Sequence, residues 1–183
     1  TPCVNSNAQF VNTTTNGNSY IWDFGDGSTP STRPNPTHVY TAVGVYTVKL
    51  IVANSRPCVD SIEKQINVTV KPTAAFSVVN PKECEQEPTV FLNTSTNAST
   101  YLWYLGNGQT STQGGLSYTY PVPGIYNVVL TAINGDCRDS ITKIAAVEIY
   151  PKPIADFLYA FTGNGFNAPV EFTNITVNGT TYF

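Results

Sequence analysis

The sequence predicts an all-β protein built from small β-sandwiches in tandem. Three observations lead to this fold class. Apolar and polar side chains alternate with a period of two, turn-forming pairs such as Asn16-Gly17 and Asp26-Gly27 separate the alternating runs, and the whole pattern returns after about 80 residues. No segment shows the 3.6-residue period of a helix. About seven short strands in 80 residues are typical of a β-sandwich.

Each predicted strand face is marked by apolar residues at every second position. In chain order the faces are Tyr20, Trp22 and Phe24; Tyr46, Val48, Leu50 and Val52; and Ile62, Ile66, Val68 and Val70. The second copy of these faces is Tyr101, Trp103 and Leu105; Tyr126, Val128, Leu130 and Ala132; and Ile141, Ala145, Val147 and Ile149.

The repeat also sets the predicted domain boundaries. The segments 20–27, 44–50 and 58–62 return at 101–108, 124–130 and 137–141, so the offset drifts only from 81 to 79 residues. We therefore expect a first domain at 1–71 that lacks its first strand, a complete second domain at 72–152, and the truncated start of a third at 153–183. The linkers near Lys71–Thr73 and Pro151–Pro153 are short and contain proline, which favours stiffly joined neighbours.

Composition excludes several classes of function. The net charge is -3, so no basic field is available to hold nucleic acid, and no apolar run approaches the length of a membrane span. A single histidine excludes enzymes that use several. We expect no catalytic residues and no membrane insertion in this segment.

The four cysteines are Cys3, Cys58, Cys84 and Cys137. They form no CxxC pair, which argues against a zinc ribbon or a redox site, and their setting in a charge-poor chain suggests an oxidising compartment. Three pairings are formally possible. We expect Cys3 with Cys58 and Cys84 with Cys137, because this pairing places one bridge in each small unit, where a thin core benefits from a staple.

The motifs of the chain resemble those of the polycystic-kidney-disease (PKD) domain. The first unit carries Trp22-Asp23-Phe24-Gly25-Asp26-Gly27, then His38-Val39-Tyr40 and Gly44-Val45-Tyr46-Thr47-Val48; the second carries Trp103-Tyr104-Leu105-Gly106-Asn107-Gly108 and Tyr118-Thr119-Tyr120. The resemblance implies tandem Ig-like (PKD-type) β-sandwiches joined by short Pro-containing linkers. The cysteine-bearing tandem units are similar to repeats of large Bacteroidetes-type cell-surface, adhesion or gliding-associated proteins.

The fold signature implied by this resemblance is a set of aromatic residues and turn glycines. Its members are Trp22, Gly25, Gly27, Tyr46, Trp103, Gly106, Gly108 and Tyr126. We expect the tryptophans in the cores rather than as sugar platforms. Tyr46 and Tyr126 resemble the tyrosine corner of Ig-like sandwiches.

Asp23 and Asp26 are a candidate calcium site, as in some PKD domains of secreted enzymes. The alternative is that both carboxylates serve the turn, which the second unit favours because Tyr104 and Asn107 stand at these positions. No other cofactor is expected. His38 has no counterpart in the second unit, where Tyr118 stands, so we expect it to be structural.

Ser61 and Ser140 are candidate sites of O-glycosylation. Asp60-Ser61-Ile62 and Asp139-Ser140-Ile141 recur at equivalent positions and look like the Asp-Ser/Thr-aliphatic signal of Bacteroidetes. The alternative is that Asp-Ser only begins the last strand in both copies.

These features favour a non-catalytic extracellular structural or adhesive segment, such as a stalk, an adhesin shaft or a filament building block, within a longer multi-PKD protein. The expected partners are neighbouring PKD repeats, self-assembly into filaments, or a surface polymer or glycan. The alternative is a spacer or polymer-binding accessory module of a secreted hydrolase.

Overall fold

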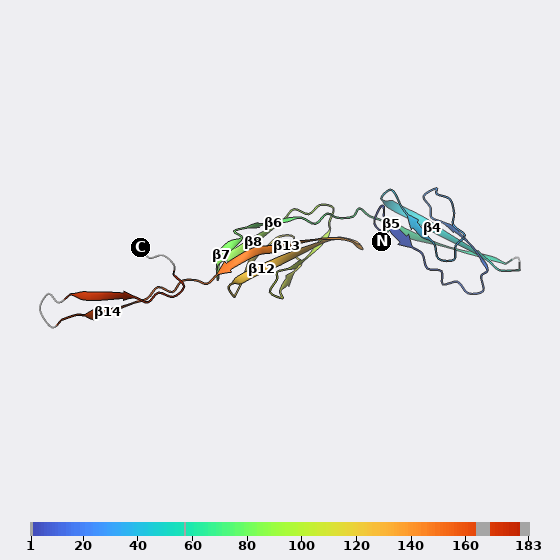
Figure 1. The fold of residues 1–183 in the computed structure, drawn as a ribbon. Coiled ribbons are helices and arrows are strands. Elements are labelled where there is room, and N and C mark those ends of the chain that lie inside the picture. Colours follow the sequence, from blue (N-terminus) through green and yellow to red (C-terminus); the bar gives the residue numbers. More distant parts are fainter. Residues whose placement is uncertain (1, 57, 164–168, 180–183) are drawn as a thin grey trace. The chain divides into compact units, whose positions relative to one another are not determined.

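The computed structural model describes residues 2–56, 58–163 and 169–179, and these residues form strands and loops without a helix (Figure 1). The all-β prediction is therefore confirmed for the described residues. The strands are β1 Asn7–Gln9, β2 Ser19–Asp23, β3 Thr37–Val39, β4 Gly44–Ala53, β5 Val59–Val68, β6 Phe76–Val79, β7 Lys82–Cys84, β8 Pro88–Asn93, β9 Thr100–Tyr104, β10 Thr110–Ser111, β11 Leu116–Thr119, β12 Gly124–Asn134, β13 Cys137–Tyr150, β14 Phe157–Phe161 and β15 Val170–Asn174.

The first predicted repeat contains two small antiparallel sheets. One has the order β2-β4-β5, and the other is the pair β1-β3. In the first of these sheets Trp22 lies opposite Leu50, which in turn lies opposite Ile62. The expected face of β4 is confirmed, since Val48, Leu50 and Val52 are buried.

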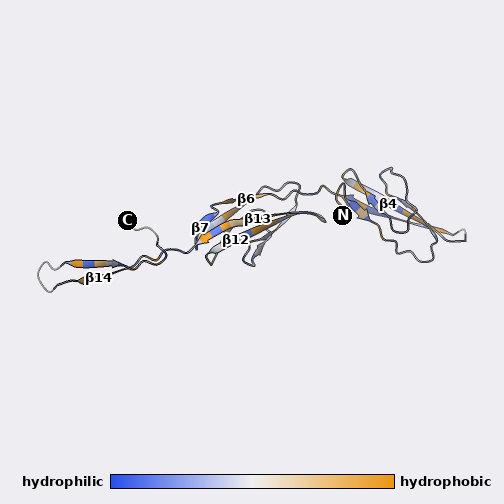
Figure 2. Cartoon of the chain, in the orientation of Figure 1, coloured by the Kyte–Doolittle hydropathy of each residue, from blue (hydrophilic) through white to orange (hydrophobic). Residues whose placement is uncertain are grey.

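The second predicted repeat has the same central strands and additional ones at the sheet edges. Its sheets have the orders β10-β9-β12-β13-β7 and β11-β8-β6. Strand β9 pairs with β12 as β2 pairs with β4, so Trp103 lies opposite Leu130. Figure 2 shows hydrophobic and hydrophilic residues following one another along β13, in keeping with a strand that has one buried face.

The predicted start of a third repeat forms the antiparallel pair β14-β15, in which Phe157 lies opposite Asn174. Every residue of both strands is exposed. Among the described residues, neither face of this two-stranded hairpin is covered, and a hairpin without a packed face is marginally stable on its own.

The chain divides in space into two compact units. One comprises Thr1–Phe76, Asn93–Gly114 and Val129–Thr142, and the other comprises Ser77–Leu92, Gly115–Val128 and Lys143–Phe183. The dividing line runs through β8, β12 and β13, so it follows the local packing of the strands and not the sequence repeat. The boundaries at 71/72 and 152/153 remain predictions from the repeat.

One predicted face differs from expectation. Ile62 is 52% exposed and Val70 is 38% exposed, whereas Val68 on the same predicted face is buried. Ile62 lines an open cavity of about 470 Å³. Among the described residues, this part of β5 is left uncovered, and Trp22 lines the same cavity.

Candidate functional site

The turn that carries Asp23 and Asp26 uses both carboxylates for its own backbone. The Gly25 N–H donates to Asp23 Oδ1 at 2.9 Å, and the N–H and hydroxyl of Ser28 donate to Asp26 Oδ1 at 3.1 and 2.6 Å. Gly25 has a φ of 77°, and a Cβ there would lie 2.4 Å from the carbonyl oxygen of Thr47. The turn therefore requires glycine at this signature position.

His38 completes this arrangement. Its Nε2 lies 2.7 Å from Asp26 Oδ2, and its ring stacks on Phe24 with centroids 4.0 Å apart. Burial acts to raise the pKa of Asp26, but the hydrogen bonds from Ser28 and His38 outweigh it and lower that pKa to about 2. Both groups are thus engaged with each other, as expected of a structural histidine.

Among the described residues, no third carboxylate, cysteine or histidine joins Asp23 and Asp26 in a cluster that could hold calcium. A hard cation needs six or more oxygens, and the two aspartates already accept hydrogen bonds. The geometry fits the turn role of Asp23 and Asp26 better than an ion site.

The two signature tryptophans occupy equivalent core positions but differ in hydrogen bonding. Trp103 is fully buried, and its Nε1–H donates to the carbonyl oxygen of Gln113 at 2.9 Å. The Nε1 of Trp22 is buried without a partner. Phe76 of β6 packs edge-on against Trp103, with ring centroids 5.2 Å apart. The cavity of the first repeat is lined by Trp22 and Ile62, where a β6 strand would supply such a ring.

Tyr46 and Tyr126 have the geometry of a tyrosine corner. Each hydroxyl donates to the backbone carbonyl four residues upstream: Tyr46 to Ala42 at 2.9 Å and Tyr126 to Val122 at 2.6 Å. Tyr40 lies next to Tyr46, and its hydroxyl donates to the carbonyl of Phe24. Burial raises the pKa of Tyr40 to about 12. These tyrosines anchor the loops that precede β4 and β12.

The disulfide pattern differs from the prediction. Cys3 is bonded to Cys137, while Cys58 and Cys84 are exposed free thiols. Both bonded residues belong to the same compact unit, although the sequence repeat assigns them to its first and second copies. The predicted bridges Cys3–Cys58 and Cys84–Cys137 are therefore wrong.

The length of the strands explains why a bridge within one repeat cannot form. Cys3 pairs in parallel with Thr69, just after β5 ends, whereas Cys58 comes just before β5 begins. Eleven residue steps of extended chain from 58 to 69 span about 36 Å. A disulfide joins Cα atoms no more than about 7 Å apart. Likewise Cys84 pairs with Tyr150 at the far end of β13 from Cys137.

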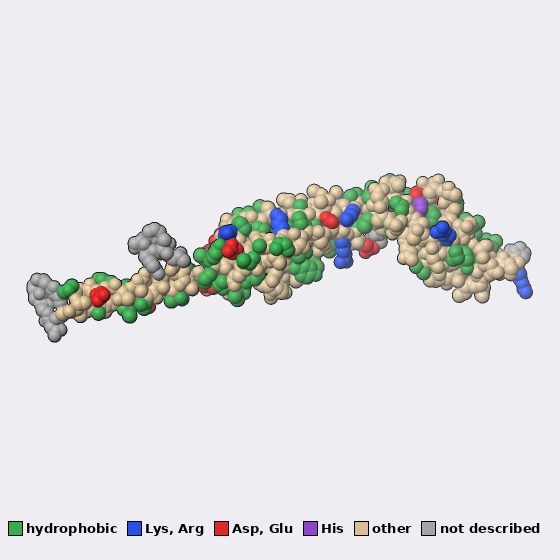
Figure 3. Space-filling model, viewed as in Figure 1, with side chains coloured by type: hydrophobic (Ala, Val, Ile, Leu, Met, Phe, Trp, Pro, Cys, Tyr) green, Lys and Arg blue, Asp and Glu red, His purple; other side chains and the backbone are tan. Residues whose placement is uncertain are grey.

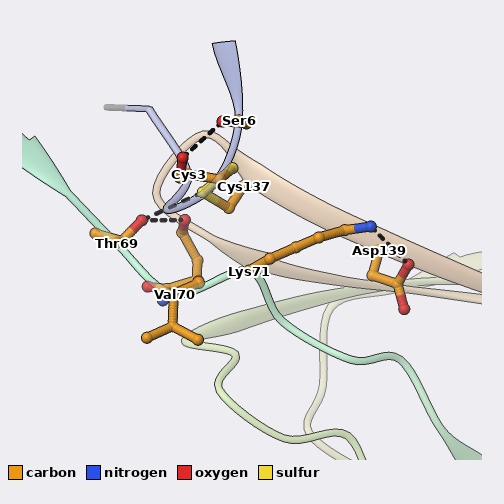
Figure 4. Close-up of a disulfide and its surroundings, with 8 residues drawn as sticks. Cys3, Ser6, Thr69, Val70, Lys71, Cys137 and Asp139 are labelled. Carbon is orange, nitrogen blue, oxygen red and sulfur yellow. Dashed lines mark hydrogen bonds and ion pairs between the residues drawn. A yellow bond between two sulfur atoms is a disulfide. The ribbon is translucent and has the colours of Figure 1, made fainter. Parts of the chain in front are cut away.

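A group of polar contacts surrounds the Cys3–Cys137 bridge, and we call it the clasp: Cys3, Thr69, Val70, Lys71, Ala74, Asn134, Cys137 and Asp139. Figure 4 shows Thr69 beside the bonded sulfur atoms and Lys71 extended toward Asp139. The Thr69 hydroxyl lies 3.3 Å from Cys137 Sγ, and the Asn134 side chain donates to the carbonyl of Val70 at 3.0 Å.

Asp139 ties the linker residues to the β12–β13 hairpin within the clasp. Its Oδ2 accepts the Ala74 N–H at 2.9 Å, and its Oδ1 lies 3.6 Å from Lys71 Nζ. The Ala74 N–H and the Lys71 ammonium hold the pKa of Asp139 below its usual value. Sequence reasoning missed this role of Asp139. The signal was the recurrence of Lys-Pro-x-Ala at 71–74 and 152–155.

Ser61 and Ser140, the candidate modification sites, are both exposed on equivalent strands, β5 and β13. The Ser140 hydroxyl lies 2.9 Å from the hydroxyl of Thr131. Their accessibility is compatible with modification, which stays a prediction. Figure 3 shows few charged side chains on the visible face, as the composition leads one to expect.

Comparison with known proteins gives two family matches, both described as PKD domain, at residues 3–70 and 74–144. Polycystin-1 of Homo sapiens is 36% identical over 132 residues, which are 67% of this chain and 3% of that protein. Collagenase ColA of Bacillus cereus is 55% identical over 53 residues, 29% of this chain and 5% of the relative.

The pre-pro-metalloprotease PrtV of Vibrio cholerae is 30% identical over 130 residues, 69% of this chain and 14% of the relative. The solved PKD1 domain of that protease has 28% identity and a TM-score of 0.37, and the match covers 44% of this chain and 98% of the domain. The chain thus spans a small part of these curated relatives.

Proposed function

Because the chain belongs to the PKD-domain family, we propose that it is a non-catalytic repeat segment of a longer, extracellular multi-PKD protein, in which it acts as a stalk, adhesin shaft or filament building block. The observation that carries this proposal is the clasp. A disulfide and several polar contacts join residues that the repeat assigns to two successive copies. A covalent connection of this kind suits a module that carries tension or that fixes how far an array of repeats extends.

The chemistry of the described residues supports a role without catalysis. The one histidine is hydrogen bonded to Asp26 and stacked on Phe24, and the aromatic signature residues are packed in the cores. Among the described residues, no helix is long and apolar enough to cross a membrane. The disulfide suits an oxidising, extracellular compartment.

The proposed surface location is tested by brief protease treatment of intact cells of the source, followed by mass spectrometry of the released peptides. Peptides from residues 1–183 should be released as readily as those of a known surface protein, while a cytoplasmic marker stays inside. Release of these peptides only after the cells are lysed would refute the extracellular assignment.

The alternative is an accessory module of a secreted hydrolase. It is favoured by the collagenase and metalloprotease relatives, since parts of ColA and PrtV align with this chain. The alternative predicts a catalytic domain in the same polypeptide and binding of the 183-residue chain to the polymer that this domain cleaves. A pull-down with fibrillar collagen, with an unrelated β-sandwich as control, tests the collagen case.

The partners follow from the same proposal. Neighbouring PKD repeats are the first, because the clasp already joins residues of two copies. Self-assembly into filaments and contact with a surface polymer or glycan are the further candidates. Exposed aromatic residues such as Tyr104 and Tyr159 would serve the last of these.

A further inference from the structure

Cys84 lies in the same backbone setting as Cys3. Cys3 pairs in parallel with Thr69, and Cys84 pairs in parallel with Tyr150, one repeat of 81 residues later. The next residue donates its N–H to the paired strand in both copies: Val4 to the Thr69 carbonyl at 2.9 Å and Glu85 to the Tyr150 carbonyl at 2.9 Å. We call these two cysteines the arm cysteines.

The agreement extends to the residues that follow. The carbonyl of Cys3 accepts the Ser6 N–H at 3.1 Å, and the carbonyl of Cys84 accepts the Glu87 N–H at 3.2 Å. Between them, Asn5 and Gln86 both have positive φ, 59° and 72°. The backbone therefore presents the sulfur of Cys84 on the same kind of turn that presents the bonded sulfur of Cys3.

Cys58 and Cys137 are equivalent at the opposite end of the repeat. Both follow the hairpin after the tyrosine-corner strand, and both precede an Asp-Ser-Ile run. Their surroundings differ in one respect: Cys137 is bonded and fully buried, whereas Cys58 is an exposed thiol. We call these two residues the hairpin cysteines. Each of the first two repeats thus has one arm cysteine and one hairpin cysteine at opposite ends of its last strand.

The aspartate and the linker of the clasp recur as well, whereas Thr69 is replaced by Tyr150 in the second copy. Asp60 is the equivalent of Asp139, and the Ser61 N–H donates to it at 2.8 Å. On the linker side, Thr73 forms a bridge with Thr96, and Ile154 forms the same bridge with Val177 one repeat later. Ala74, whose N–H donates to Asp139, is buried, whereas the equivalent Ala155 is exposed. The first repeat therefore carries the hairpin side of a second clasp, and the second repeat carries the arm side of a third one.

We propose that Cys84 and Cys58 are half-clasps: Cys84 bonds to the hairpin cysteine of the PKD repeat that follows, and Cys58 bonds to the arm cysteine of the repeat that precedes. Disulfides then join successive repeats along the array and none closes within a repeat. This inference rests on the proposed function, since it requires flanking repeats of the same kind. The sequence places Gly165 at the arm position of the third repeat, so no clasp follows that repeat.

Bond formation requires an oxidant, which we identify by class as a disulfide, either of a thiol oxidoreductase or of oxidised glutathione. One cysteine thiolate attacks a sulfur of the oxidant, forming a mixed disulfide and releasing one oxidant thiolate. The second cysteine thiolate then attacks the protein sulfur of the mixed disulfide and releases the other oxidant thiolate. The two protein thiols lose two protons and two electrons, and the oxidant becomes a dithiol or two thiols.

The test is disulfide mapping of the protein isolated from its source, alkylated without reduction. Trypsin alone leaves Cys84 and Cys137 on one peptide, because no Lys or Arg lies between Glu83 and Arg138. A glutamate-specific protease must be added, which cuts after Glu83 and Glu85 and so separates Cys84 from Cys137. We expect Cys3 linked to Cys137, and Cys84 and Cys58 each linked to a cysteine peptide from outside the 183 residues.

Two matched variants sharpen the result. Cys84→Ser should leave one alkylated hairpin cysteine in the following repeat, and Cys58→Ser should leave one alkylated arm cysteine in the preceding repeat. In the 183-residue chain expressed alone, we expect both Cys58 and Cys84 to react with the alkylating agent, and Cys3 and Cys137 to react only after reduction.

Three results would overturn the inference: alkylated Cys84 or Cys58 in the native protein, a bond from either to a cysteine of its own repeat, or no newly alkylated cysteine in the variants. The proposed function fails separately. If the native protein contains no further PKD repeats, both proposals are lost; if it contains them but Cys84 carries the alkyl group, only the half-clasps are refuted.

Discussion

The different hydrogen bonding of the two signature tryptophans predicts that the same substitution costs different amounts in the two repeats. Trp103→Phe and Trp22→Phe remove the same atoms from equivalent positions of β9 and β2. In the second repeat the change also removes the Nε1–H bond to the Gln113 carbonyl, and this carbonyl loses its indole donor. In the first repeat it removes a buried N–H that has no partner.

The magnitude follows from these contacts. Loss of ring volume is common to both variants and costs about 1–2 kcal/mol, as for moderate core truncations. The hydrogen bond to Gln113 contributes about 0.5–1.5 kcal/mol net, because Gln113 is exposed and water can replace the indole donor there, and only Trp103→Phe has this cost. Trp22→Phe instead removes an unpaired buried N–H, so the free-energy cost of burying that group is removed as well. We therefore expect Trp103→Phe to be more destabilising by at least about 1 kcal/mol, or about 4–8 °C in the Tm of a domain of this size.

Hydrogen exchange followed by mass spectrometry assigns the change to each repeat, using amides of β4 for the first and of β12 for the second. Each variant is the control for the other, since the untouched repeat should keep its protection. Equal losses of protection in β4 and β12, or a larger loss for Trp22→Phe, would refute the argument from the indole hydrogen bond.

Individual contacts give three other predictions. The pKa of Asp26 is lowered from 3.8 to about 2, so its contribution to stability is fully present above pH 3.8 and is lost as the pH falls through about 2. Asp26→Asn should therefore lower the urea midpoint of unfolding at about pH 7. An unchanged midpoint would contradict the Ser28 and His38 contacts. Asp139→Ala should speed hydrogen exchange at the Ala74 amide, while the equivalent Asp60→Ala should leave the exchange of that amide unchanged. The same exchange rate in both variants would show that the hydrogen bond from the Ala74 N–H to Asp139 is not formed in solution. Ser61 and Ser140 are exposed in the same Asp-Ser-Ile context, so we expect native peptides to carry the same glycan on both; unmodified peptides alone would dispose of the O-glycosylation hypothesis.

Alternation and repetition predicted most of the fold, because both depend on which side chains must be buried. Val48, Leu50 and Val52 alternate on a strand with one covered face, and this face is buried. Ile62 follows the same pattern but is exposed, because it faces an open cavity and no packed element of the described chain covers it. Periodicity identifies the face of a strand, and only the neighbouring elements determine whether that face is covered.

The disulfide pairing could not be obtained in the same way. One bridge per repeat was the expectation, since the cysteines come in pairs along the sequence. The decisive quantity is the length of the strand between Cys58 and Thr69. Cys3 lies beside Thr69, at the end of that strand far from Cys58. That length was available from the sequence, but the parallel pairing of the Cys3 arm with the far end of β5 was not, because nothing local in the sequence specifies a contact between residues 66 positions apart.

The central claim, a segment of a longer array of PKD repeats, is tested most directly by the intact mass of the protein from its source, combined with peptide sequencing. We predict a mass far above the 19.8 kDa of this chain, with peptides from further PKD repeats. A mass near 19.8 kDa, or a larger polypeptide whose remaining sequence is a hydrolase domain without further repeats, would contradict it.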